Sequence, residues 1–206
     1  MKNLCFMCLY MLVMIFTSTL SQANTEEVSC ERMSYSVSEK GKSLYHLSAT
    51  LKCIVRTDKP YQPLLMLESY DRYLHSDLNL NLTKRKEKED GSLSYKGRKK
   101  ITTVHGKMDI KGDLHLNLTD KDSFIYEFKS RSISADGNAE NTKSMREQVK
   151  INSYHDKMEI ILTNEASVKK PWYAPEVLFL PAAKDGMIED TEELRKEHLG
   201  VVELFK

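Results

Sequence analysis

The stretch that decides the fold is Leu44–Arg56, which reads LYHLSATLKCIVR. Every second side chain from Tyr45 to Val55 is apolar, and mostly polar side chains such as His46 stand between them. Alternation with a period of two is typical of a β-strand that buries one face. Cys53 falls on the buried face, which indicates a structural role for its sulfur.

The rest of the chain switches between a helical period and the same period of two. Residues 61–74 repeat their apolar side chains every three or four positions, which predicts a helix, or two short helical turns if Pro63 splits it. Roughly six further antiparallel strands follow, separated by turns at sites such as Asp90–Gly91 and Lys111–Gly112. Their apolar positions fall within residues 78–83, 93–95, 99–110, 113–119, 124–128, 149–151 and 158–162.

The chain is expected to end in a long helix, from about Asp185 to Phe205. Its side chains at helical spacing form one face that must bury against the sheet. The residues of this face are Met187, Thr191, Leu194, His198, Val201 and Phe205.

The segment before that helix carries a family resemblance. Asn164–Pro175 reads NEASVKKPWYAP. A final strand, a Lys-Pro-aromatic-Pro passage and a long helix occur in this order in START-like proteins. Over residues 43–206 the chain resembles this helix-grip superfamily, which includes polyketide cyclases and lipid-transfer proteins.

The resemblance implies an α+β fold. In it, a curved antiparallel sheet of about seven strands wraps around a long C-terminal helix, and an apolar cavity lies between them. The chain departs from the pattern in its leader, its cysteine pair and its single helical segment after the first strand. These departures leave ligand binding open.

Residues 1–23 have the three parts of a signal peptide: a basic start, an apolar run from Leu4 to Phe16, and small residues at Ser21 and Ala23. A membrane anchor is the alternative, but this run is shorter than the ~20 residues that cross a bilayer. We therefore expect an exported protein, periplasmic or extracellular, whose mature chain begins at Asn24. Residues 24–42 are expected to be a polar N-terminal arm with a short strand near 33–37.

Two cysteines remain after the leader is removed, Cys30 and Cys53. An exported chain with one pair favours a disulfide over two free buried thiols. The Cα atoms of such a pair should lie within about 7 Å of each other. Two cysteines without a nearby histidine pair do not make a zinc site.

Charge and motifs exclude several classes of function. The 31 Lys and Arg residues against 30 Asp and Glu give no basic field for nucleic acid, particularly as Lys2 belongs to the leader. No nucleophile elbow, phosphate loop, dinucleotide fingerprint or zinc motif occurs, so no catalytic residue, cofactor or metal site is predicted. Asn81 and Asn117 match the glycosylation pattern, and each of the six histidines is expected to be solvated.

Three functions remain. The first is a binding protein for a lipid or other hydrophobic small molecule. The second is a structural or protein-interaction domain of this fold, or a lipocalin-like barrel, with a packed interior, and the third, less favoured, is a hydrolase or cyclase. Trp172 either lines a cavity or fills the joint between sheet and helix. The candidate ligand-binding residues are Trp172, Tyr173, Met187, Leu194, Phe124, Tyr126 and Phe128.

Overall fold

The computed structural model describes residues 28–41, 43–57, 63–74, 80–103, 106–120 and 122–203. The predicted signal peptide, residues 1–23, lies outside this part of the chain. The described elements are β1 (Val28–Cys30), β2 (Ser34–Glu39), β3 (Leu44–Arg56), α2 (Pro63–Leu74), β4 (Leu80–Glu87), β5 (Leu93–Thr103), β6 (Gly106–Asp120), β7 (Ser123–Ala135), the 3₁₀ turn η1 (Gly137–Asn141), β8 (Thr142–Ser153), β9 (Lys157–Lys169) and α3 (Glu176–Glu203).

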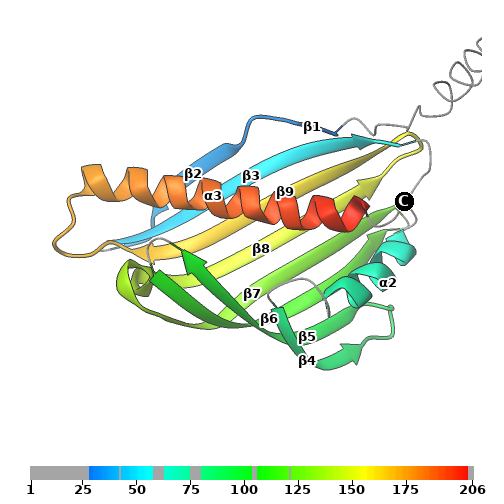
Figure 1. Ribbon diagram of the computed structural model, residues 1–206, viewed down its shortest axis with the longest axis horizontal. Helices are drawn as coiled ribbons and strands as arrows, with labels where there is room; N and C mark the ends of the chain where they lie inside the picture. Colours follow the sequence, from blue (N-terminus) through cyan, green and yellow to red (C-terminus); the bar gives the residue numbers. More distant parts are fainter. Residues whose placement is uncertain are drawn as a thin grey trace, which may run out of the picture.

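The strands form one antiparallel sheet in the order β1-β3-β9-β8-β7-β6-β5-β4, and β2 pairs with β3 beside β1. Strands β4 to β9 are joined in sequence, each to its neighbour. The first long strand, β3, then pairs along its whole length with the last one, β9. The sequence therefore brings its first and last long strands together, and these two strands make the floor on which α3 lies (Figure 1).

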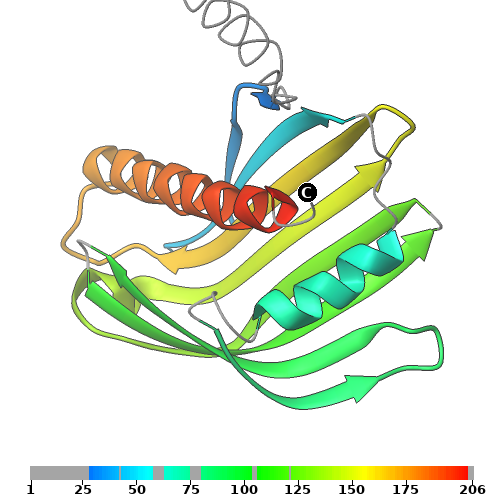
Figure 2. The same cartoon turned by 45° about the vertical axis from the view of Figure 1, so that its right-hand side comes forward.

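Both helices lie on the same, concave face of the sheet (Figures 1 and 2). α3 crosses β3 and β9, while α2 lies over β6 and β7. This is the helix-grip arrangement, and the predicted fold class is confirmed. About seven strands were expected in the domain and β3–β9 are seven, but the expected stretch 99–110 is divided between β5 and β6. The two additional strands come from the N-terminal arm.

The alternation that defines β3 continues across the sheet. Tyr45, Leu47, Ala49, Leu51, Cys53 and Val55 are all buried, and the residues between them are half-buried. β9 has the same pattern. Because inward side chains of neighbouring strands meet in register, the concave face becomes one continuous apolar core.

The turn expected at Lys111–Gly112 is wrong, because β6 runs through both residues. Gly112 pairs with Gly97 of β5, and the ring of Phe128 covers both. A Cβ atom at position 112 would lie 2.5 Å from the Lys129 carbonyl and 2.7 Å from the Phe128 ring. This glycine allows a close packing contact at an irregularity in the β6–β7 register.

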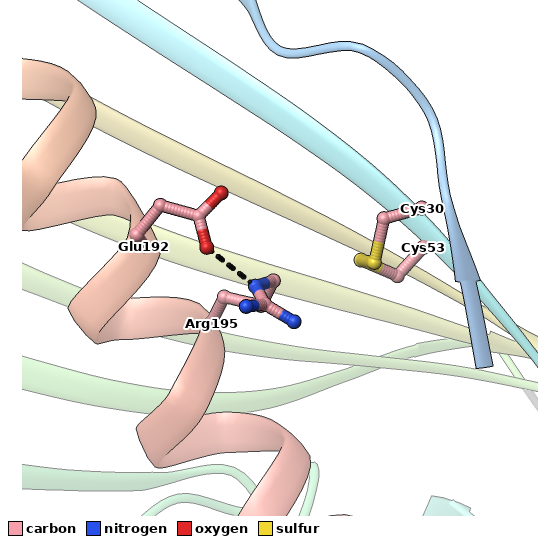
Figure 3. The surroundings of a disulfide bond; sticks show 4 residues. All are labelled: Cys30, Cys53, Glu192 and Arg195. Atoms are coloured by element: carbon pink, nitrogen blue, oxygen red, sulfur yellow. Dashed lines mark hydrogen bonds and ion pairs between the residues drawn. A yellow bond between two sulfur atoms is a disulfide. The ribbon is translucent and has the colours of Figure 1, made fainter.

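The N-terminal arm is paired with the sheet where a loose segment with one short strand was expected. β1 places Cys30 directly opposite Cys53, and the two are joined by a disulfide with Cα atoms 4.0 Å apart (Figure 3). The predicted pairing is confirmed. The bond joins residues 23 positions apart in the sequence and holds the arm on the edge of β3. The Glu192–Arg195 pair of α3 is drawn beside it in Figure 3.

The two helices differ from their predicted bounds at their N-termini. α2 begins at Pro63, so this proline starts the helix and does not split it. α3 begins at Glu176, nine positions before the expected start, and includes Pro181. A proline within the second turn lacks one backbone donor, and its exposed position leaves the matching carbonyl accessible to water. No helix in the described ranges combines the length and the apolar character that crossing a membrane requires.

Candidate functional site

The interior between the sheet and the helices holds five of the seven nominated ligand-binding residues. Phe124, Tyr126 and Phe128 of β7 are buried, as are Met187 and Leu194 of α3. The three aromatic residues share the inward face of β7 because they are two positions apart. They form an aromatic wall across the middle of the concave face.

Trp172 and Tyr173 lie elsewhere. Their side chains are 92% and 64% exposed. Trp172 therefore fits neither interpretation made from the sequence, since it does not fill the joint between sheet and helix and does not face the buried interior. Trp172 lies in the short connection between β9 and α3. This connection extends past the end of the sheet (Figure 1).

A charged cluster crosses the same interior, and the sequence reading did not find it. Lys99 shares the inward face of β5 with Tyr95 and Gly97, and Glu147 points inward from β8. The Lys99 Nζ atom lies 2.8 Å from Glu147 Oε1 and 4.0 Å from Glu197 Oε2 of α3. The side chains of Lys99 and Glu147 are only 14% and 6% exposed. One buried ammonium group thus links the far half of the sheet to the helix.

Two buried acceptors beside this cluster have no hydrogen-bond partner among the described residues: Glu147 Oε2 and Asn164 Oδ1. They are neighbours, because Glu147 of β8 pairs with Asn164 of β9. Phe128 pairs with Glu147 from the other side, so the acceptors adjoin the aromatic wall. A buried polar atom without a partner costs about 1–3 kcal/mol, which a ligand or water with a donor would recover.

The carboxyl groups of α3 that flank this cluster have raised pKa values. Burial, reinforced by the nearby negative charge of Glu147, raises the pKa of Asp190 to about 7. Burial also raises the pKa of Glu197, against the opposing attraction of Lys99. Burial alone would lower the pKa of Lys99, but the surrounding carboxylates outweigh it and raise the value. Such shifts are typical of functional sites.

A buried histidine connects the two helices. His198 Nδ1 of α3 lies 2.9 Å from the Tyr70 hydroxyl of α2, and the His198 ring is 4.7 Å from that of Tyr126, centre to centre. Its Nε2 atom is buried without a partner among the described residues. Burial, and then the charge of Lys99, lower the pKa of His198 to about 3, so the ring is neutral at pH 7.

The expectation that each histidine is solvated is therefore wrong for His198, which is fully buried. The signal was present in the sequence. His198 stands four positions after Leu194 and three before Val201, on the stripe that was correctly expected to be buried. Lys99 and Glu147 gave a weaker signal, since each is a single charged residue at an inward position of a strand.

A polar hollow lies on the outer face of the sheet. Its lining includes His46, Glu127, Arg146 and Glu165. Arg146 donates to Glu127 over 2.6 Å and to Glu165 over 3.2 Å, so its charge is matched within the hollow. This hollow also holds a buried atom without a hydrogen-bond partner among the described residues, His46 Nδ1, but the inner cluster differs because its unmatched acceptors adjoin the aromatic wall. In the part of the chain that the structure describes, no group of three or more His, Cys, Asp or Glu side chains could hold a metal ion.

Comparison with solved structures finds chains of similar architecture. The Zhui aromatase/cyclase from Streptomyces sp. R1128 has a TM-score of 0.43 and 12% identity, covering 77% of this chain and 91% of that one. A protein from Arthrobacter aurescens has a TM-score of 0.38 and 13% identity, over 81% and 88% of the two chains. A STAR-related lipid transfer protein from Xanthomonas axonopodis has a TM-score of 0.35 and 7% identity, over 66% and 85%.

No protein-family model matches the sequence, and no curated protein matches it. The fold assignment rests on the strand order and on the position of α3, both described above.

Proposed function

We propose that this chain is an exported binding protein for a lipid or other hydrophobic small molecule, held between the sheet and α3. The observation that carries the proposal is the pair of unpartnered buried acceptors, Glu147 Oε2 and Asn164 Oδ1, beside the aromatic wall. A domain that needed only to pack would be as stable, or more stable, with apolar groups in these positions. A binding site keeps them because a ligand satisfies them.

The apolar part of the ligand would lie against the aromatic wall of Phe124, Tyr126 and Phe128 and against Met187 and Leu194 of α3. These side chains supply a large apolar surface on both sides of the interior. A few precisely placed polar groups within an apolar lining are the usual composition of a small-molecule site.

The polar end of the ligand would carry hydrogen-bond donors. The cluster has three acidic side chains, Glu147, Asp190 and Glu197, against one ammonium group. Lys99 is already within ion-pair distance of Glu147 and Glu197, and the unpartnered oxygens are acceptors. The balance of charge therefore favours an ammonium or hydroxyl head group and disfavours a carboxylate.

Export is supported by two features of the chain. Residues 1–23 have the composition of a cleaved leader, and the Cys30–Cys53 disulfide is of the kind that persists in oxidising compartments.

The test compares ligands that differ only in their head group. Dodecylamine, dodecanol and dodecanoate are titrated below their micellar concentrations, and the melting temperature is followed at pH 7. A ligand that binds only the folded state stabilises it by RT ln(1 + [L]/Kd), which is about 2.7 kcal/mol at a hundred times Kd. We expect the amine to stabilise most and the carboxylate least.

The matched variants are Glu147→Gln and Glu89→Gln. The first neutralises the buried acceptor and should remove the preference for the amine. The second neutralises an exposed carboxylate in the turn between β4 and β5 and should leave the preference intact. If none of the three compounds raises the melting temperature of the wild-type chain, the ligand proposal fails, and the packed structural domain becomes the better interpretation.

A further inference from the structure

A small apolar surface protrudes from the connection between β9 and α3 and from the first turn of α3. Trp172, Tyr173, Val177 and Leu178 are 92%, 64%, 76% and 67% exposed. These four residues, which we name the aromatic loop, fall within seven consecutive positions. Among the residues that the structure describes, the other large apolar side chains that are exposed, Val28, Val37 and Tyr154, are dispersed and less exposed. Scattered exposed apolar residues are ordinary, whereas a cluster indicates an interaction surface.

The backbone holds the aromatic loop in place. The Lys170 amide donates to the Ser43 carbonyl over 2.7 Å, which fixes the end of β9 to the turn before β3. The Ala174 amide donates to the Pro171 carbonyl over 3.1 Å, and the Lys170 ammonium donates to the Ala174 carbonyl over 3.0 Å. The exposed rings of Trp172 and Tyr173 pack edge-on, 5.8 Å apart. The rings are therefore presented to solvent by an ordered turn.

Lysines surround the aromatic loop at this end of the sheet. Lys169 ends β9 and pairs with Leu44, whose carbonyl accepts from the Lys40 amide. Lys143 lies at the start of β8, beside the last residues of β9. All three lysine side chains are exposed.

The acidic groups nearby are Glu39, Glu140 and Glu176. Burial, and then hydrogen bonding to Glu176 and its charge, raise the pKa of the Tyr45 hydroxyl, so this carboxylate is directed to Tyr45. The charge of Glu39 also raises the pKa of the Tyr45 hydroxyl. Glu140 is exposed beside Lys143, whose ammonium donates to its carbonyl. Among the described residues, the ammonium groups of Lys40 and Lys169 make no ion pair, so these two lysines remain available to an anionic surface.

We infer that the aromatic loop docks the protein on the surface of an anionic phospholipid bilayer. Tryptophan and tyrosine have an apolar body and a polar handle, and both concentrate at the level of the lipid head groups. Basic side chains at the same level are attracted by anionic lipids. This inference concerns a surface outside the proposed ligand site and does not depend on it.

The single tryptophan of the chain is Trp172, so its fluorescence reports on the aromatic loop alone. The mature chain, its N-terminus established by intact mass, is mixed with vesicles of phosphatidylcholine and with vesicles of phosphatidylcholine and phosphatidylglycerol at three to one. With the anionic vesicles we expect a blue shift of the emission and quenching by brominated lipid. We expect binding at least tenfold stronger than to the neutral vesicles.

Cosedimentation with the same vesicles compares variants. Tyr173→Ser and Leu178→Ser should each weaken binding severalfold, as should Lys169→Glu. Tyr154→Ser is the control, because this exposed tyrosine lies at the opposite end of β9, and its binding should equal that of the wild type. Unchanged emission with both vesicles, equal binding to both, or equal binding by all variants would overturn the inference. So would sedimentation showing that the aromatic loop pairs two copies of the chain.

Discussion

The two sides of α3 face different surroundings. Towards β3 and β9, the stripe of Met187, Leu194 and Val201 packs on an apolar floor. Towards β5 and β8, Asp190 and Glu197 face the Lys99–Glu147 pair. Burying an apolar side chain stabilises a fold by about 1.5–3 kcal/mol, whereas burying charge carries a desolvation cost that the pairing only partly offsets.

The difference distinguishes the part of the interior that stabilises the fold from the part that has another role. The side of α3 that carries Met187, Leu194 and Val201 is apolar, as packing alone requires. The other side retains charged groups whose removal as a set would be neutral or favourable for folding. Substitutions on the two sides of α3 should therefore change the free energy of unfolding by different amounts.

The largest effect is expected on the apolar side. Leu194→Asp places a charge in the contact between α3 and the sheet, where Leu194 is buried. We expect a loss of about 3–5 kcal/mol in the free energy of unfolding, measured by urea denaturation. Lys196→Asp, an exposed change on the same helix, should cost under about 0.5 kcal/mol. Equal midpoints for Leu194→Asp and the wild type would show that α3 does not grip the sheet.

A smaller loss is expected on the charged side. Lys99→Met removes the ammonium group and leaves Glu147 buried without its positive partner. We expect a loss of about 2–3 kcal/mol in the free energy of unfolding, because an uncompensated buried carboxylate must be desolvated or protonated. The same urea denaturation at pH 7 measures it.

The double variant Lys99→Met with Glu147→Leu sharpens the comparison. Both charges are then gone, so the free energy of unfolding should return to within about 1 kcal/mol of the wild type or exceed it. The response to dodecylamine should disappear in the same protein. A double variant that is less stable than Lys99→Met alone would mean that the cluster is required for folding.

The sequence predicted the apolar side of α3 well and the charged side poorly. Alternation in Leu44–Arg56 and the helical spacing of Met187, Leu194 and Val201 are local patterns that show burial directly. The contact of Lys99 with Glu147 joins residues 48 positions apart, and it depends on strand pairing that no local pattern shows. Gly112 was misread for the same reason, since only the neighbouring strands reveal that Phe128 covers it.

The smallest expected effect is the dependence of stability on pH, to which two titrating groups on α3, Asp190 and His198, contribute in opposite directions. Asp190 has a pKa of about 7 in the folded chain and 3.8 as its ordinary value. The folded state therefore holds this proton more tightly, and the stability it contributes is lost as pH rises from about 4 through 7. One pKa unit corresponds to about 1.4 kcal/mol, so partial solvent exposure leaves a cost on the order of 2 kcal/mol above pH 7.

His198 makes the stability of the fold depend on pH in the opposite direction. Its pKa is about 3 in the folded chain against an ordinary 6.5, so its contribution is complete above pH 6.5 and is lost as pH falls towards 3. Between about pH 4 and 6.5 the two groups compensate each other in the wild type. Four charged groups act on Asp190: Glu147, Glu189, Glu193 and Lys99. The contribution of Asp190 alone is obtained at each pH as the difference in the free energy of unfolding between the wild type and a variant of this residue.

Asp190→Asn should match the wild type at pH 4 and become more stable by about 2 kcal/mol at pH 8, with the difference growing between these values. His198→Gln should show its loss of stability mainly above pH 6.5, and that loss should shrink as the solution is acidified, because the wild-type ring then pays to stay neutral. Urea denaturation from pH 4 to 8 gives both difference curves. Curves that slope in the same direction with pH would mean that the two groups do not share the buried interior, since burial raises the pKa of an acid and lowers that of a base.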